Sequence, residues 1–229
     1  WEPAQGFAVL LAQARDEADR LTDLVAEVRV TADNGAQRQQ ASAVLQLHSP
    51  GMLRLEVRGP LYSHLLTVVQ VDDTLYVEGP AVDGAWHGPV RGPLLARLTG
   101  LELGGYDLRD ALLGVVQPAP VEAVEPLPDG DLAVVRLAST TGGRRRVWID
   151  AGRGLVRREE LAVPDSGWSL TRRLGDYRRV GPALLPGRVE FRQGSSSLRL
   201  DYVHCWTDRR LRRELFLEAT RRPDSRLIE

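Results

Sequence analysis

The N-terminal segment places apolar side chains at the spacing of an α-helix, with Arg, Asp and Glu filling the positions between them. Pro3 and Gly6 stand at the start of this stripe, where residues that break helices belong. The pattern predicts an N-terminal helix within residues 1–24. Its apolar stripe consists of Phe7, Leu10, Leu11, Ala14, Ala18 and Leu21.

After this helix the apolar positions recur at every second residue, which is the period of a β-strand. In residues 52–58 aliphatic side chains occupy one face and charged side chains alternate with them. The same signals predict strands around Leu45 and Leu47, over 65–70 and over 75–78, with turns at Gly59-Pro60 and Asp72-Asp73. These strands form a meander with tight turns.

The middle of the chain departs from this pattern. Residues 93–98 and 108–113 are rich in Leu at helical spacing, and Gly100 and Gly114 follow them as helix-stopping residues. Asp107 stands where an N-cap is expected for the second of these helices. Two short Leu-rich helices inside a β meander need an apolar surface to cover.

Strand patterns then resume and continue almost to the end of the chain. The predicted strands are 132–137, 145–150, 156–163, 168–180, 187–192 and 197–206, and the Pro-rich stretch 118–128 is a loop with room for one more. Residues 208–219 are ambiguous, because Leu211 and Leu215 fit a helix whereas Leu215 and Leu217 fit a strand.

The order of elements is therefore a helix, about five strands, two short helices and about six strands. Short connections favour an antiparallel sheet, and a sheet of this many strands curls towards a barrel. We expect a mainly β (α+β) protein with one curled antiparallel sheet. A single domain spans 1–229: N-terminal helix 1–24, first strands 25–90, lid helices 91–115, later strands 116–206 and a C-terminal segment 207–229.

Composition narrows the class of protein. The 229 residues include 43% hydrophobic and 27% charged residues with a net charge of −1, which argues against a generally basic nucleic-acid binder and against a disordered acidic chain. All basic residues are Arg, and they concentrate in the second half of the chain. An Arg-rich half either docks on an anionic partner or forms solvated strand faces.

Candidate catalytic chemistry is sparse. The single cysteine, Cys205, allows no intramolecular disulfide, and its neighbour His204 points to the opposite face of a strand. The four histidines lack metal-ligand spacing, and Gly104-Gly105 lacks the remainder of a phosphate-loop fingerprint. We nominate no catalytic residue, metal or cofactor and expect a protein that is not an enzyme. Aromatic residues among arginines (Trp168, Tyr177 and Tyr202) are too few to predict RNA binding.

The remaining feature of the sequence is the abundance of Leu and Val in the predicted strands and central helices. A curled sheet with a Leu-rich and Val-rich concave face, covered by helices, suits acyl chains, which need apolar volume rather than hydrogen bonds. The candidate lining is Leu45, Leu47, Leu53, Leu55, Val57, Leu66, Val68, Leu75 and Val77. The candidate lid is Leu94, Leu95, Leu98, Leu108, Leu112 and Leu113. The alternative is an ordinary filled core made of the same residues.

Several stretches, in order along residues 21–216, resemble the LolA/LolB-like lipoprotein-sorting family and most closely its outer-membrane lipoprotein receptors, LolB. The two central helices with their Leu-Thr-Gly and Leu-Leu-Gly endings resemble those of LolB. The matching stretches are 92–103 and 106–114, Arg58-Gly-Pro-Leu61, Val147-Trp-Ile-Asp150 with 154–160, and 185–190.

The resemblance implies an unclosed β-barrel with helices in its open side and a cavity that accepts the acyl chains of lipids or lipoproteins. It also implies membrane delivery by an exposed leucine, which by motif is Leu61, although Tyr62 stands where the family has glycine. The implied setting is the bacterial periplasm, at the outer membrane, with a lipidated cysteine before Trp1 and a periplasmic carrier protein as partner. The alternative function is a scaffold subunit of an envelope complex with a filled core, which docks through Arg144, Arg145 and Arg146.

Overall fold

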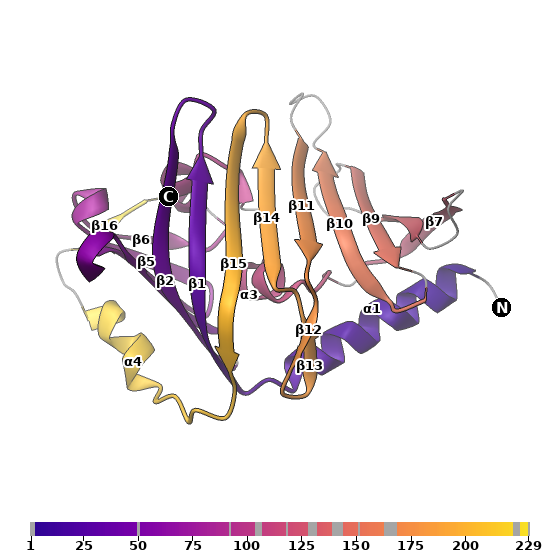
Figure 1. Ribbon diagram of the computed structural model, residues 1–229, viewed down its shortest axis with the longest axis horizontal. Helices are drawn as coiled ribbons and strands as arrows, with labels where there is room; N and C mark the ends of the chain where they lie inside the picture. The colour runs from indigo at the N-terminus through magenta and orange to yellow at the C-terminus, as the bar shows by residue number, and fades with distance from the viewer. Residues whose placement is uncertain are drawn as a thin grey trace.

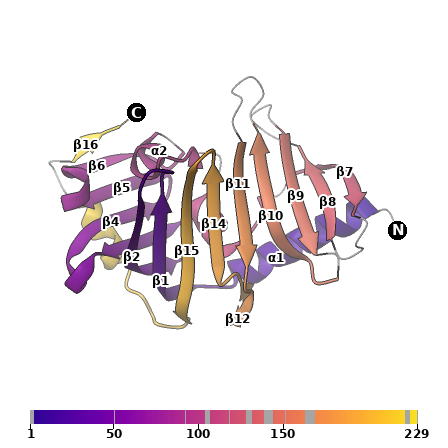
Figure 2. The ribbon, with the colours of Figure 1, turned by 45° about the horizontal axis from the view of Figure 1, so that its top comes forward.

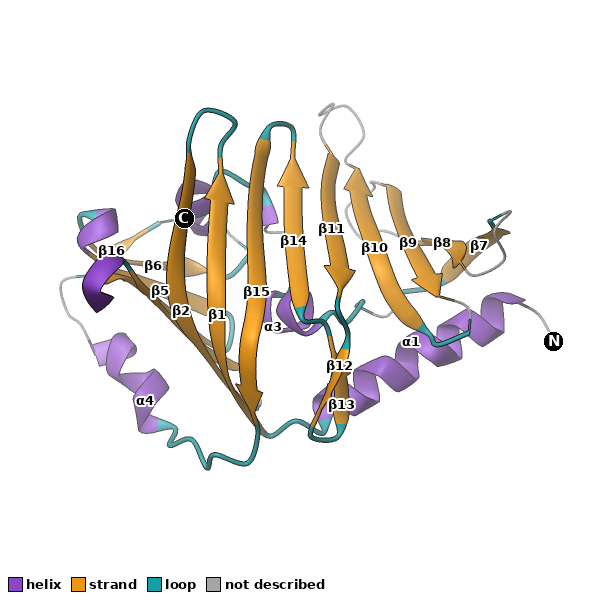
Figure 3. Cartoon of the chain, in the orientation of Figure 1, coloured by secondary structure: helices purple, strands orange, loops and turns teal. Residues whose placement is uncertain are grey.

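The computed structural model describes residues 3–49, 51–91, 93–103, 107–117, 119–127, 132–138, 144–150, 152–162, 169–221 and 225–228. Most of them belong to one large sheet that curls strongly at the β3–β6 side (Figures 1 and 3). Among the described strands the two edges, β16 and β7, do not pair with each other, so the sheet is open. The predicted fold class, a mainly β protein with one curled sheet, is confirmed.

The strand order is β16-β6-β5-β4-β3-β2-β1-β15-β14-β11-β10-β9-β8-β7, antiparallel except for β16 against β6. The strands are β1 (Asp23–Asp33), β2 (Arg38–His48), β3 (Met52–Arg58), β4 (His64–Val71), β5 (Thr74–Gly79), β6 (Gly84–Pro89), β7 (Val121–Pro126), β8 (Leu132–Leu137), β9 (Arg144–Asp150), β10 (Leu155–Ala162), β11 (Ser169–Gly175), β14 (Arg188–Gln193), β15 (Ser196–Trp206) and β16 (Arg226–Leu227). A separate small hairpin joins β12 (Arg178–Val180) to β13 (Ala183–Leu185).

The chain enters this sheet at its centre. From β1 it runs outward to β6, crosses to the opposite edge at β7 and returns to the centre at β15. The ladder between β1 and β15 therefore joins two meanders, with Val30 opposite Leu200. The crossing segment contains α2 (Leu94–Thr99) and α3 (Leu108–Leu113), which lie inside the curve of the sheet, behind β1, β2, β14 and β15 (Figures 1 and 2).

The ends of these helices follow from local chemistry. The Asp107 carboxylate accepts a hydrogen bond from the Asp110 N–H at the start of α3, and Gly114 ends α3 in the left-handed region with φ 78°. Gly100 ends α2 in the same way with φ 70°. Both central helices are confirmed, α3 with the predicted bounds and α2 displaced by one residue.

The N-terminal helix is also confirmed, as α1 (Pro3–Asp19), which packs against β7 and β13. The ambiguous C-terminal stretch contains α4 (Glu214–Leu217) followed by a 3₁₀ turn (Glu218–Arg221). The single strand predicted over 168–180 is wrong: the chain turns at Asp176, with φ 55°, and divides it into β11 and β12. Trp168 and Val163 lie outside the described residues.

Side chains of the curved strands point alternately to the two faces of the sheet, and each face has its own hydrophobic core. The main core lies on the concave side, under α1, α2 and α3. A small second core lies on the outer face, where Phe216 of α4 packs against Met52 and Val69. No helix in the described part of the chain is long and apolar enough to span a bilayer.

Candidate functional site

A cavity of about 320 Å³ lies between the concave face of the sheet and helices α2 and α3. Of its 22 lining residues 19 are apolar and three (Gln39, Gln40 and Thr99) are polar and uncharged. The apolar lining comprises Val30, Ala32, Ala41, Leu53, Leu55, Val57, Leu65, Leu66, Val68, Ala81, Leu95, Leu98, Leu103, Leu108, Ala111, Leu112, Phe191, Leu198 and Leu200. A space of this chemistry accepts hydrocarbon and offers no strong partner to a charged group.

Five of the nine residues predicted to line the sheet side do so: Leu53, Leu55, Val57, Leu66 and Val68. The other four, Leu45, Leu47, Leu75 and Val77, belong to the filled part of the same core and are at most 4% exposed. The two-residue period identifies the face of the sheet on which a side chain lies. It does not tell which part of that face other side chains cover.

The predicted lid divides in a similar way. Leu95, Leu98, Leu108 and Leu112 line the cavity, whereas Leu94 and Leu113 are buried in the core beside it. Sequence reasoning missed the opposite wall, which consists of Phe191, Leu198 and Leu200 of β14 and β15. Their alternation was visible in the sequence. Only the β1–β15 ladder, which brings the end of the chain back beside its beginning, shows that they share this space.

Helix α3 is attached to the sheet by a buried Arg172. Its guanidinium donates hydrogen bonds to the carbonyl oxygens of Asp110 (3.2 Å), Ala111 (3.0 Å) and Val115 (2.9 Å) and lies 2.5 Å from the carboxylate of Glu159. Both charged side chains have no exposed surface. The Asp110 carbonyl also accepts from the backbone N–H groups of Gly114 and Val115, whereas the Ala111 carbonyl lies in the last turn, where helix carbonyls lack an intrahelical partner. The guanidinium adds a positive charge where the helix dipole is negative.

A second polar contact holds the same turn of α3. The Tyr202 hydroxyl donates to the Leu112 carbonyl oxygen at 3.0 Å, and burial raises the pKa of this phenol. Arg145 adds a second positive group, with one nitrogen 2.7 Å from Glu159 and another donating to the Gln117 carbonyl. The segment that follows α3 is therefore fixed by buried charge-assisted bonds.

The other side of α3 is tied to α1. Arg15 lies 2.8 Å from the Asp110 carboxylate, and Arg109 lies 2.9 Å from Asp19. Burial raises the pKa of Asp110, although the hydrogen bond from Arg15 opposes this shift. The carboxylate of Asp110 therefore sits in a place where carrying a charge is costly.

Helix α2 has a different environment. Leu94 and Leu95 are buried, and the outer side of the helix contacts β6 through Arg97, whose guanidinium carbon lies 5.0 Å from the Trp86 ring centroid. The Thr99 hydroxyl donates to Leu95 within the helix itself. Thus α2 is attached by apolar packing and one cation–π contact at its exposed side.

The loop after β3 presents two apolar side chains to solvent. Leu61 is 98% exposed and Tyr62 is 81% exposed, within a 3₁₀ turn, η1 (Pro60–Tyr62). Both residues are in the left-handed region, with φ 55° and 58°. This conformation costs about 1–2 kcal/mol for a residue with a Cβ atom, so the loop combines strain with exposed apolar surface. Exposure of this size fits the delivery role predicted for Leu61 and Tyr62 but does not test it.

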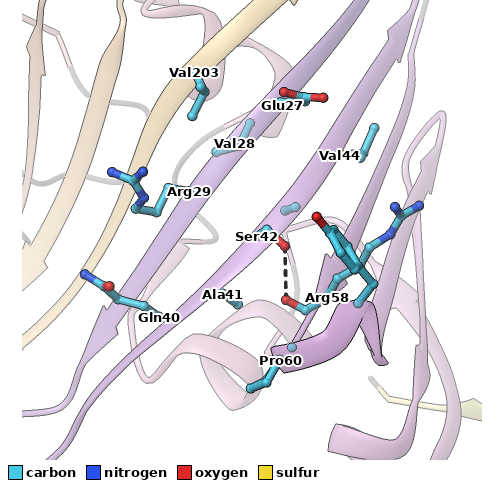
Figure 4. Close-up of a pocket in the computed structure, with 13 residues that line it drawn as sticks. Glu27, Val28, Arg29, Gln40, Ala41, Ser42, Val44, Arg58, Pro60 and Val203 are labelled. Atoms are coloured by element: carbon cyan, nitrogen blue, oxygen red, sulfur yellow. Dashed lines mark hydrogen bonds between the residues drawn. The ribbon is translucent and has the colours of Figure 1, made fainter.

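A groove of about 520 Å³ runs over the outer face of β15, β1 and β2 and reaches this loop (Figure 4). Val44, Ala41 and Val203 contribute apolar surface, and Glu27, Arg29 and Arg58 carry charges of both signs. The Ser42 hydroxyl donates to the Arg58 carbonyl oxygen at 3.4 Å, the dashed line in Figure 4.

Other candidate groups have structural partners. Cys205 is half-buried, accepts a hydrogen bond from Arg178 and has a pKa that burial raises, and His204 contacts Glu27 at 3.0 Å on the exposed face. The Tyr177 hydroxyl donates to the Val156 carbonyl, and the Arg157 guanidinium carbon lies 5.7 Å from the Tyr177 ring centroid. Tyr202 is buried. No group of three or more metal-ligating side chains occurs among the described residues. Gly104-Gly105 lies outside them.

No family model and no curated protein matches the chain. Solved structures match its fold. A DUF1329 family protein from Desulfovibrio piger gives a TM-score of 0.70 at 13% identity over 94% of this chain and 98% of that one. A LolA superfamily protein from Nitrosomonas europaea gives 0.65 at 13% identity over 93% and 96%. An outer-membrane lipoprotein-sorting protein domain from Vibrio parahaemolyticus gives 0.66 at 14% identity over 92% and 96%.

Similarity at these identities shows the fold alone. The chain therefore has the fold of LolA superfamily proteins, and the expected fold resemblance is confirmed at that level. The closer resemblance to LolB stays a prediction.

Proposed function

We propose that this protein binds acyl chains of lipids or lipoproteins non-covalently in the cavity under α2 and α3. The observation that carries the proposal is the cavity itself: 19 of its 22 lining residues are apolar, and none of the 22 is charged. Each methylene group moved from water into such a space contributes about 0.8 kcal/mol. A polar or charged small molecule would lose its hydration there without compensation.

The size of the cavity sets the length of chain that fits. A cavity of about 150 Å³ binds benzene, which corresponds to roughly 25 Å³ for each carbon. By this measure the 320 Å³ of the cavity accommodates about a dozen carbons of one chain, so a palmitoyl chain would fill it and leave about four carbons at its mouth. A molecule with several acyl chains requires α2 to move outward and enlarge the space.

The finer role that we propose is lipoprotein sorting or insertion at the bacterial outer membrane, on its periplasmic side. One fold neighbour is named as a lipoprotein-sorting domain, and this supports the proposal by analogy. Exposed Leu61 and Tyr62 would enter a membrane during delivery, and a periplasmic carrier would supply the cargo. No step of this role involves catalysis.

The scaffold alternative receives less support. It requires a filled core and a free arginine surface, whereas a cavity is present and Arg145 is committed to Glu159 and Gln117 inside the protein. In the arginine run 144–146, Arg146 is exposed and pairs with the carboxylate of Glu160.

The decisive experiment measures binding of N-palmitoyl-cysteine amide by native mass spectrometry and by displacement of a fluorescent fatty acid. We expect a stoichiometry of one and loss of binding in Leu112→Asp, because the new carboxylate faces the hydrocarbon space. Leu113→Ala is the matched control, since the neighbouring Leu113 is in the core and does not line the cavity. Unchanged binding in a folded Leu112→Asp variant would contradict the proposal.

A further inference from the structure

Strand β2 (11 residues) is longer than its neighbour β3 (7 residues). It pairs with β1 along its whole length, from Arg38 to His48. Its ladder with β3 ends at the pair Ser42–Arg58, because Gly59 and Pro60 turn the chain away. Residues 38–41 therefore extend beyond β3, and Arg38 and Gln40 are exposed.

The hydrogen-bond register gives the direction of the backbone groups in this extension. Asn34 N–H donates to the Gln37 carbonyl at 3.2 Å, and Ser49 N–H donates to the Thr22 carbonyl at 2.9 Å. Bonded pairs alternate along an antiparallel ladder, so odd-numbered residues of β2 bond to β1 and even-numbered residues face the other neighbour. The N–H and C=O of Arg38 and Gln40 consequently point to the side that β3 has left. No described strand pairs with them there, and we call these groups the free edge of β2.

This edge borders the acyl cavity. Gln40 and Ala41 line the cavity on the concave side and also the outer groove, so the two spaces meet at this part of β2. Pro60 and Tyr62 form the opposite wall of the groove. A polymer attached to an acyl chain would pass the free edge if it left the cavity at Gln40 and Ala41, where the cavity meets the groove.

We propose that the free edge at Arg38 and Gln40 binds, by strand addition, the extended polypeptide segment joined to an acyl chain in the cavity. The inference rests on the proposed function and narrows it: the preferred ligand is an acylated polypeptide rather than a free lipid. Strand addition recognises main-chain groups. The groove carries both Glu27 and Arg29, so no single charge is selected, and peptides of differing sequence are accepted.

The test compares three ligands: N-palmitoyl-cysteine amide, an N-palmitoyl-cysteinyl peptide with about five further residues, and the same peptide N-methylated at alternate amides. We expect the peptide to bind about tenfold more tightly than the amide, and N-methylation to abolish the gain. Because this comparison uses the unaltered protein, it does not depend on whether a variant folds.

Two variants at one position test the protein side. Arg38→Pro removes an N–H that the β1 ladder does not use, at a position that does not line the cavity, and proline is tolerated on such edges. We expect Arg38→Pro to lose most of the gain for the peptide and to bind the amide as before. Arg38→Ala, which keeps the N–H, retains both affinities.

The outcomes separate the two proposals. If the amide itself fails to bind, the proposed function fails. If the amide binds and the peptide binds no better, or if N-methylation has no effect, the strand-addition proposal is overturned while the cavity assignment stands. A dimer of the free protein that Arg38→Pro disperses would assign the edge to a second copy and would also overturn the strand-addition proposal.

Discussion

The guanidinium of Arg172 on β11 and the carboxylate of Glu159 on β10 lie 2.5 Å apart, and neither side chain has any exposed surface. Arg172 also holds three carbonyl oxygens at the end of α3. The pair thus fixes one of the two helices over the cavity to the sheet. We infer that α3 is the static part of the cover and that α2 is the part that moves.

Arg172→Met is expected to destabilise the protein by about 3–5 kcal/mol, because it leaves the buried Glu159 with one cationic partner fewer. Urea unfolding gives the free energy. Arg192→Met is the control: Arg192 is half-exposed and pairs with Glu190 on the surface, so its loss costs at most about 1 kcal/mol. Equal losses in the two variants would contradict the structural role of Arg172.

Helices α2 and α3 contain six residues each, which makes them matched probes of local opening. We expect amide hydrogens of α2 to exchange faster than those of α3, because among the described residues the buried polar bonds between a central helix and the sheet are made by α3. Hydrogen exchange with mass spectrometry measures this. A bound acyl chain should slow the exchange of α2 more than that of α3. The reverse order of protection would refute the assignment of the moving part.

Leu61→Gly and Tyr62→Gly should leave stability unchanged or raise it by up to about 1 kcal/mol, because glycine adopts φ 55° and φ 58° without strain. The same variants should slow transfer of N-palmitoyl-cysteine amide to phospholipid vesicles several-fold, because the exposed apolar side chain is lost. Leu61→Ala separates the effects: it retains the strain and lacks the large side chain. Normal transfer by all three variants would exclude this loop from delivery.

Asp110 and Asp201 should change the free energy of unfolding with pH in opposite directions. Burial raises the pKa of Asp110, so the folded state binds that proton more tightly than the unfolded state. The stability of the wild type relative to Asp110→Asn should therefore fall as pH rises above about 4. Urea unfolding of both proteins between about pH 3 and about pH 7 measures this difference.

For Asp201, burial acts in the raising direction, but hydrogen bonds from Arg199 and Arg188 outweigh it and lower the pKa. Its ion pairs stabilise the fold above the ordinary carboxyl pKa. The stability of the wild type relative to Asp201→Asn should be lost as pH falls below about 4. The same slope for both residues would contradict one of the two assignments.

Much of the fold could be predicted from the sequence, because the signals were local. Asp107 and Gly114 delimit α3 by capping chemistry alone, and the alternation in β3 identifies its cavity face. Strands β1 and β6 were not predicted individually. In β1 the buried positions include the small Ala26 and in β6 glycines replace apolar residues, so both patterns are weak.

The site depended on information that no local pattern carries. Phe191 and Leu198 line the cavity because β15 returns beside β1, far away in the sequence. Arg172 and Glu159 read as ordinary strand residues, since nothing in the sequence indicates that their face of the sheet is covered by the end of α3. The extension of β2 beyond β3 likewise follows only from the register of its two ladders, with β1 and with β3.

The ladder that joins β1 to β15 also has a consequence for how the chain folds. On either side of it, most strands pair with neighbours close in sequence, so each meander can form quickly from local hairpins. Bringing Val30 beside Leu200 instead closes a loop that contains most of the chain, at an entropic cost that grows with the logarithm of its length. We therefore expect this closure to come last. Because the cavity has walls from both meanders, it would form only when β15 has paired with β1.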